Sequence, residues 1–209
     1  PIFCKSVEKK IKKPNFLFIT VDDLGWSDLG CFGSDLHETP NIDKFATQGQ
    51  KFTNAYAAAP VCSPTRASFL SGKTPAKLNM TIWRESAKNT VVDRKLLPPD
   101  VEDNLPLSEV TFPEVLDSAG YATAHLGKWH VGDFEHFPEL QGFDINVGAT
   151  VWGCPPTFFY PYRGHMSFGS FRFTPGLQKD SSGKYKVDRD GEYLTDRLTD
   201  EALSVLEGV

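Results

Sequence analysis

The 209-residue sequence predicts an α/β fold with a largely parallel central sheet flanked by helices. Residues 15–21, NFLFITV, form an apolar run without alternation, which is typical of a strand buried on both faces of a parallel sheet. Segments with strand and helix patterns then alternate along the chain. The composition, 40% hydrophobic and 23% charged residues, is that of a globular protein with a real core.

Charge, hydropathy and cysteine content exclude several classes. The net charge of −5 gives no general attraction to nucleic acid or to an anionic membrane. No run of 18 apolar residues exists, so no transmembrane helix is predicted. Residues 1–13 are charged and lack an apolar core, and they are interpreted as an N-terminal extension, not as a signal peptide. The 4 cysteines lack zinc-site spacing, and at most one disulfide is expected.

The first half of the chain shows clear helix boundaries. A polar turn at residues 22–25 follows the first strand, and Thr39 and Pro40 are expected to begin a helix that Gly49 ends. Residues 51–57 are expected to form a second strand.

The next helix has three boundary signals. Ser63 is a capping residue, Pro64 suits the first helical position, and Gly72 suits the end. Cys62 therefore lies immediately before a helix N-terminus. Residues 73–107 have weak periodicity and are interpreted as a long excursion with room for one short helix.

A capping box begins the second half. Thr111 and Glu114 form the T-x-x-E pattern of a helix that Gly120 ends. Strands are expected at residues 121–126 and 143–147.

Residues 151–185 are loop-like and rich in aromatic side chains, which either line a substrate cleft or pack as a surface loop. Within this segment, Arg163 and the aromatic residues of 152–173 are the candidates for lining such a cleft. The chain then ends in a predicted amphipathic helix, whose apolar face comprises Leu194, Leu198, Ala202, Val205 and Leu206.

Candidate functional residues follow two strand ends, where ligands bind in parallel sheets. Asp22 and Asp23 repel each other unless a cation such as Ca²⁺ or Mg²⁺ offsets their charge. The alternative is that Asp22 caps the turn and Asp23 is solvated. Lys128 and His130 are two residues apart, so in an extended chain they point to the same side and offer a cation and a proton carrier. The alternative for His130 is an exposed histidine at a strand end.

Cys62 is a candidate nucleophile. The helix dipole and Arg66 favour an anion at this position, whereas the alternative is a small buried hydrophobic residue. Of the other histidines, His37 and His136 are expected at the surface and His125 within a strand, and His165 has no assigned setting.

Four blocks of sequence resemble the type I sulfatase family. Residues 62–66, CSPTR, resemble its C-x-P-x-R signature, and residues 14–23 resemble its opening strand and metal-binding aspartate pair. Residues 39–43 and 127–130 are similar to two further blocks, in the same order. The resemblance implies the alkaline-phosphatase-like fold and hydrolysis of an aryl or carbohydrate sulfate ester.

The resemblance also implies the chemistry of the nucleophile. In the family the cysteine that corresponds to Cys62 is oxidised by a modifying enzyme to Cα-formylglycine, whose hydrated gem-diol attacks sulfur. Arg66 would stabilise the ionised diol, Lys128 would contact the sulfate, and His130 would orient the diol and assist its deprotonation.

A metal site is implied as well. Asp22, Asp23 and the modified Cys62 would bind Ca²⁺, in preference to Mg²⁺. These groups supply fewer than the 6 to 8 oxygens that Ca²⁺ takes. Family members are longer and carry further ligands in their later half. Residues 14–209 are therefore expected to be the N-terminal portion of a catalytic domain, incomplete at its C-terminal end and not active alone.

Two alternatives stay open at this point. One is a phosphodiesterase or phosphonate monoester hydrolase of the same superfamily, and the other is a catalytically inactive binding remnant. The family resemblance further implies an exported protein, in the periplasm, the lysosome or outside the cell.

Overall fold

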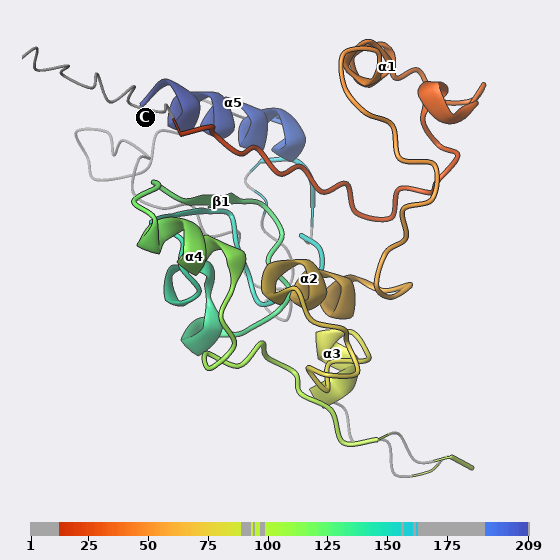
Figure 1. The fold of residues 1–209 in the computed structure, drawn as a ribbon. Helices are drawn as coiled ribbons and strands as arrows, with labels where there is room; N and C mark the ends of the chain where they lie inside the picture. The colour runs from red at the N-terminus through yellow and green to blue at the C-terminus, as the bar shows by residue number, and fades with distance from the viewer. Residues whose placement is uncertain are drawn as a thin grey trace, which may run out of the picture. The chain divides into compact units, whose positions relative to one another are not determined.

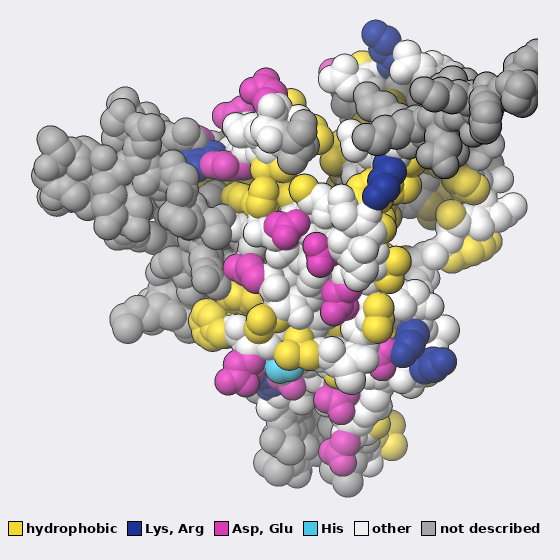
Figure 2. Space-filling model, turned by 60° about the vertical axis from the view of Figure 1, so that its left-hand side comes forward, with side chains coloured by type: hydrophobic (Ala, Val, Ile, Leu, Met, Phe, Trp, Pro, Cys, Tyr) yellow, Lys and Arg dark blue, Asp and Glu magenta, His cyan; other side chains and the backbone are white. Residues whose placement is uncertain are grey.

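The structure is a computed structural model that describes residues 13–88, 93, 95–96, 99–155, 157–160, 162 and 191–208. The chain divides into two compact units, Pro1–Asn54 and Ala55–Val209 (Figure 1). Among the described residues, no helix is long and apolar enough to cross a membrane. Figure 2 shows a face on which acidic side chains are spread among apolar ones.

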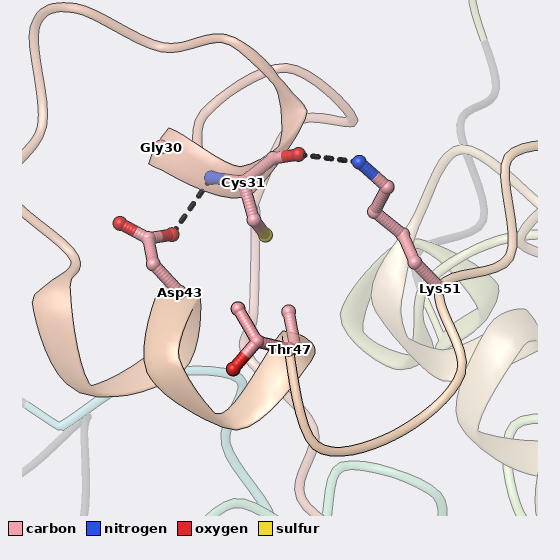
Figure 3. Close-up of a pocket in the computed structure, with 6 residues that line it drawn as sticks. Gly30, Cys31, Asp43, Thr47 and Lys51 are labelled. Carbon is pink, nitrogen blue, oxygen red and sulfur yellow. Dashed lines mark hydrogen bonds between the residues drawn. The ribbon is translucent and has the colours of Figure 1, made fainter.

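The first unit contains the 3-10 helix η1 (Gly30–Phe32) and the helix α1 (Pro40–Ala46). Pro40 begins α1 as predicted, but the helix ends three residues before Gly49. Two side chains hold the backbone of Cys31 (Figure 3): the Asp43 carboxylate accepts its N–H at 2.7 Å, and the Lys51 ammonium donates to its carbonyl at 2.8 Å. These contacts connect η1 to α1 and to the segment after it.

Two predicted strands are wrong. Residues 15–21 and 51–57 are irregular in the structure, and the apolar side chains of the first segment are exposed, with Phe16 at 65% and Ile19 at 74%. A β-branched, apolar sequence forms a strand only where a neighbouring strand satisfies its backbone N–H and C=O groups. In the described ranges the two named strands, β1 (Ala124–Leu126) and β2 (Ile145–Val147), pair with each other.

The second unit contains the core. Its described helices are α2 (Cys62–Ser71), α3 (Arg84–Lys88), α4 (Phe112–Ser118), η2 (Phe134–His136), η3 (Pro138–Leu140) and α5 (Leu194–Glu207). Buried apolar side chains from α2 and from the segments around β1 pack together. They are Ala67, Leu70, Leu78, Met80, Leu105, Trp129, Val131, Phe137 and Ala149.

Strands β1 and β2 are parallel, with Ala124 opposite Ile145 and Leu126 opposite Val147. This confirms the predicted parallel pairing, although both strands are shorter than the predicted 121–126 and 143–147. His125 lies in β1, as expected.

The predicted capping box at the start of α4 is confirmed. Thr111 is fully buried, and its N–H donates to the Glu114 carboxylate at 2.7 Å. Gly142 lies against this turn, because a Cβ there would come within 2.4 Å of the Glu114 nitrogen. The first turn of α4 is thus fixed by packing as well as by its own cap.

Helix α2 begins two residues earlier than predicted. Cys62 is its first residue and Val61 its N-cap, so Ser63 does not cap the helix. The Ser63 hydroxyl instead accepts the backbone N–H of Arg84 at 3.1 Å, which connects α2 to α3. Gly72 ends α2 in the left-handed conformation, φ 68°, as predicted.

Helix α5 confirms the predicted amphipathic helix over its first three turns. Leu194 is buried and Leu198, Ala202 and Val205 are partly buried, whereas Leu206 is 50% exposed. The helix lies beside β1 (Figure 1), and Leu198 faces Gly127. The expectation for residues 151–185 falls largely outside the described residues, as do Arg163 and His165.

Candidate functional site

Cys62, a free thiol, lies at the N-terminus of α2, where backbone N–H groups point outward. Burial raises the pKa of this thiol. The interaction with the His130 ring, the positive charges of His130 and Lys128, and the Ser63 N–H outweigh burial. The net pKa lies below its ordinary value, so the site favours an anion at residue 62.

His130 is 2% exposed and has a left-handed backbone, with φ 61°. A non-glycine residue pays for that conformation, and such residues concentrate at functional sites. Nε2 of the ring lies 2.6 Å from the Glu85 carboxylate, and Nδ1 has no hydrogen-bond partner among the described residues. Glu85 therefore holds one nitrogen, and the ring also interacts with the Cys62 side chain.

Neighbouring side chains and burial shift the pKa of His130 in opposite directions. Burial lowers the pKa of the ring, but its interactions with Cys62 and with Glu85 raise the pKa by more, and the net direction is upward. The pKa values of Cys62 and His130 therefore move toward each other, as in a thiolate–imidazolium pair.

Glu85 is a site residue that the sequence analysis missed. It belongs to the five-residue helix α3 and also accepts the Gly153 N–H at 3.1 Å. Burial raises the pKa of its carboxyl. The hydrogen bond and charge of His130 and two backbone N–H groups lower the pKa by more, so the net direction is downward. The local sequence RESAK gives no signal, since it resembles a solvated charged turn, and only the tertiary contact identifies Glu85.

Arg84 holds α3 in place. Its side chain is almost fully buried, donates to Asn104 at 3.2 Å and to the Val151 carbonyl at 3.3 Å, and pairs with Asp133 at 3.4 Å. Because Arg84 is adjacent to Glu85, this network also fixes the position of the Glu85 backbone.

Arg66 connects α2 to the segment after β1. Its guanidinium is 8% exposed and donates to the Lys128 carbonyl at 2.5 Å. Burial, followed by the Arg66 charge, lowers the pKa of His125 to about 4. Arg66 therefore holds the backbone that carries Lys128 and His130 beside α2.

The His130 ring interacts directly with Cys62 and the Lys128 charge acts on it, but not for the predicted reason. The segment is not extended, since Gly127 has φ 92° and His130 has φ 61°. A turn directly after β1, and not strand alternation, directs both residues toward the start of α2.

Asp22 and Asp23 lie in the first unit, on an exposed turn, and Asp23 has a left-handed φ of 58°. They line a hollow together with Asp28 and Glu38. Carboxylates are ligands of the type that Ca²⁺ takes. Across the described ranges, however, no group of three or more His, Cys, Asp or Glu side chains is arranged to hold a metal ion. The two aspartates thus have the right chemistry but supply only part of a coordination shell.

The other described histidines and cysteines that the sequence analysis considered lie outside this cluster of side chains. His37 is exposed, and His136 is partly exposed, with Nδ1 2.8 Å from Asp133. Cys31, Cys62 and Cys154 are free thiols. The structure thus brings Cys62, Arg66, Lys128 and His130 together in one unit.

Comparison with known families identifies the family of this chain. The sequence model of the family described as Sulfatase matches residues 14–208, and the chain belongs to the sulfatase family. The human N-acetylgalactosamine-6-sulfatase is 39% identical over 150 residues, and human arylsulfatase G is 40% identical over 159 residues. These matches cover 71% and 74% of this chain but 27% and 28% of the relatives. The chain thus spans little more than a quarter of their length.

Solved structures give the same result for the fold. The crystal structure of Ps i-CgsB aligns with a TM-score of 0.68 and 29% identity, covering 94% of this chain and 42% of that one. The structure of BT4656 in complex with its substrate D-glucosamine-2-N,6-O-disulfate aligns with a TM-score of 0.60 and 29% identity, covering 95% and 32%. The predicted α/β class, a parallel sheet with helices in a partial sulfatase fold, is confirmed.

Proposed function

We propose that this protein hydrolyses sulfate esters of aryl or carbohydrate alcohols. The observation that carries the proposal is the position of Cys62: it begins α2, it opens the C-x-P-x-R motif, and both Lys128 and His130 favour an anion there. The relatives are named as sulfatases, and one structural neighbour is described with a disulfated glucosamine. These names support a sulfated small molecule or glycan as the substrate.

The proposal assigns the nucleophile to residue 62 after its oxidation to formylglycine by a modifying enzyme. That group, once formed, supplies a hydrated aldehyde whose hydroxyl attacks sulfur. The helix N-terminus and the Lys128 charge that favour a thiolate favour an alkoxide for the same electrostatic reason.

The other side chains have distinct roles. Lys128 places a positive charge beside residue 62 and neutralises the sulfate oxygens as charge develops on them. His130 holds or accepts a proton at Nδ1, since Glu85 occupies Nε2 and the ring interacts with Cys62. Arg66 adds positive charge and holds the Lys128 backbone in place.

Calcium is proposed as the metal, in line with the donor chemistry of the turn. Asp22 and Asp23 would hold it through their carboxylate oxygens. When bound, Ca²⁺ supplies positive charge that stabilises an anionic nucleophile and substrate. Because it takes 6 to 8 oxygens, the complete site needs oxygens beyond these. We also propose that the protein is exported from the cytoplasm.

The first test is sulfate release from 4-nitrophenyl sulfate by the full-length protein and its Cys62→Ala variant. The variant is expected to lose hydrolysis, whereas Cys154→Ala, at an exposed free thiol, is expected to keep it. Mass spectrometry of the peptide around Cys62 is expected to show a loss of about 18 Da on conversion of the thiol to an aldehyde. Activity of Cys62→Ala near that of the wild type would overturn the proposal.

The second test concerns Lys128. The variant Lys128→Ala is expected to lose at least about 10²-fold in rate, the usual cost of removing a donor to the transition state. Lys77→Ala, at an exposed lysine, is the matched control. Faster turnover of phosphodiesters or phosphonate esters than of sulfate esters would assign the protein to the alternative hydrolase class instead.

A further inference from the structure

We propose that Glu85 is a positioning residue that fixes the ring orientation and the tautomer of His130. In this arrangement the Glu85 carboxylate holds Nε2–H, and Nδ1 is the nitrogen left for residue 62. The consequence for catalysis rests on the proposed function, whereas the tautomer itself does not.

The geometry shows a ring held on several sides. Nε2 of His130 lies 2.6 Å from Glu85 Oε2, and the ring is 2% exposed. Gly153 lies against the ring, because a Cβ there would come within 2.5 Å of Cε1 and 3.0 Å of both nitrogens. The left-handed backbone of His130, φ 61°, sets the direction in which the side chain leaves the chain. The ring therefore has little freedom to rotate.

The chemistry of the carboxylate determines the tautomer. An ionised carboxylate accepts hydrogen bonds and cannot donate them, so a neutral ring must carry its proton on Nε2. Nδ1 then bears the lone pair. This atom is buried and has no partner among the described residues, while the same ring interacts with Cys62. A lone pair in that place can accept a proton from a hydroxyl on residue 62.

Both oxygens of Glu85 are in use, which makes the carboxylate hard to replace. Oε2 faces His130, and Oε1 accepts the Gly153 N–H at 3.1 Å. A glutamine has one acceptor oxygen and one NH₂ donor. If its oxygen stays with Gly153, its NH₂ faces Nε2, and the proton of a neutral ring moves to Nδ1. Glu85→Gln is thus nearly identical in shape but reverses the predicted tautomer.

The experiment is ¹⁵N NMR of the full-length protein labelled at histidine, at a pH where the His130 ring is neutral, with assignment by His130→Gln. The wild type is expected to show the Nε2–H tautomer, and Glu85→Gln the Nδ1–H tautomer. Glu135→Gln is the matched control, since Glu135 is exposed and its side chain lies outside this network, and it is expected to leave the spectrum unchanged.

Kinetics give the second readout. On 4-nitrophenyl sulfate, Glu85→Gln is expected to lower kcat by about 10- to 100-fold with little change in KM, as for other residues that orient a functional side chain. An Nδ1–H tautomer in the wild type, or an unchanged tautomer in Glu85→Gln, would overturn the inference. The wild-type spectrum decides even if the variant fails to fold. Absence of sulfatase activity in the wild type would count against the proposed function and leave the tautomer result standing.

Discussion

The two compact units contain different sets of the predicted residues and are packed in different ways. Residues 13–54 contain the Asp22–Asp23 pair, and none of them is buried. Residues 55–208 contain Cys62 and His130, within a unit whose core includes fully buried Met80 and Leu105. Cys62 is therefore positioned by the packing of its own unit, whereas the aspartate pair lies on an exposed turn.

The largest expected effect comes from a pair of alanine substitutions, one in each unit, that compare how much each side chain contributes to the free energy of unfolding. Met80→Ala removes a side chain of 0% exposure and is expected to lower the free energy of unfolding by about 2–5 kcal/mol through lost burial and a cavity. Phe18→Ala removes a side chain that is 60% exposed and is expected to change it by less than about 0.5 kcal/mol. Urea unfolding followed by tryptophan fluorescence measures both.

Equal destabilisation by the two substitutions would break the comparison. It would mean that Phe18 is buried in solution as deeply as Met80, and that the first unit has a core of its own.

The second test uses the pH dependence of stability. Burial and the Arg66 charge lower the pKa of His125 to about 4, from an ordinary value of 6.5. Between these values the unfolded chain binds the proton and the folded chain does not. The free energy of unfolding is therefore highest above pH 6.5 and falls as the pH falls toward 4, by up to about 3 kcal/mol from this residue.

The measurement is the urea midpoint as a function of pH for the wild type and for His125→Gln. The variant is expected to lose less stability than the wild type between pH 6.5 and pH 4. His37→Gln, at an exposed histidine of the first unit, is the control and should follow the wild type. Parallel curves for wild type and His125→Gln would show that His125 is not a buried neutral ring.

The sequence predicted best what depends on a few neighbouring residues. Pro40 marked the start of α1, Gly72 the end of α2, and Thr111 with Glu114 the start of α4, since each acts within one turn of helix. The strand predicted at residues 15–21 was wrong because a strand depends on partner strands distant in sequence. Local propensity could not supply them.

The site divides in the same way. The motif residues Cys62 and Lys128 could be found from the sequence, because each lies in a block with a recognisable pattern. Glu85 could not, because its role comes from a 2.6 Å contact across 45 positions of sequence, made possible by the buried Arg84 next to it. The left-handed backbone of His130 was also missed, since no pattern in residues 127–130, GKWH, predicts it.

The smallest effect expected concerns the two helix starts. Thr111→Ala removes a fully buried hydroxyl that lies within hydrogen-bond distance of the Glu114 carboxylate and of the Gln141 carbonyl. The substitution is expected to cost about 1 kcal/mol of global stability, with Thr111→Ser close to the wild type. Thr39→Ala removes a hydroxyl that accepts the Gly30 N–H at 2.9 Å, in the unit where none of the described residues 13–54 is buried. Its effect is expected in amide hydrogen exchange around α1, with an unchanged urea midpoint, because local opening there does not require the core of the second unit to unfold. A shift of the midpoint by Thr39→Ala equal to that of Thr111→Ala would show that the two units unfold as one.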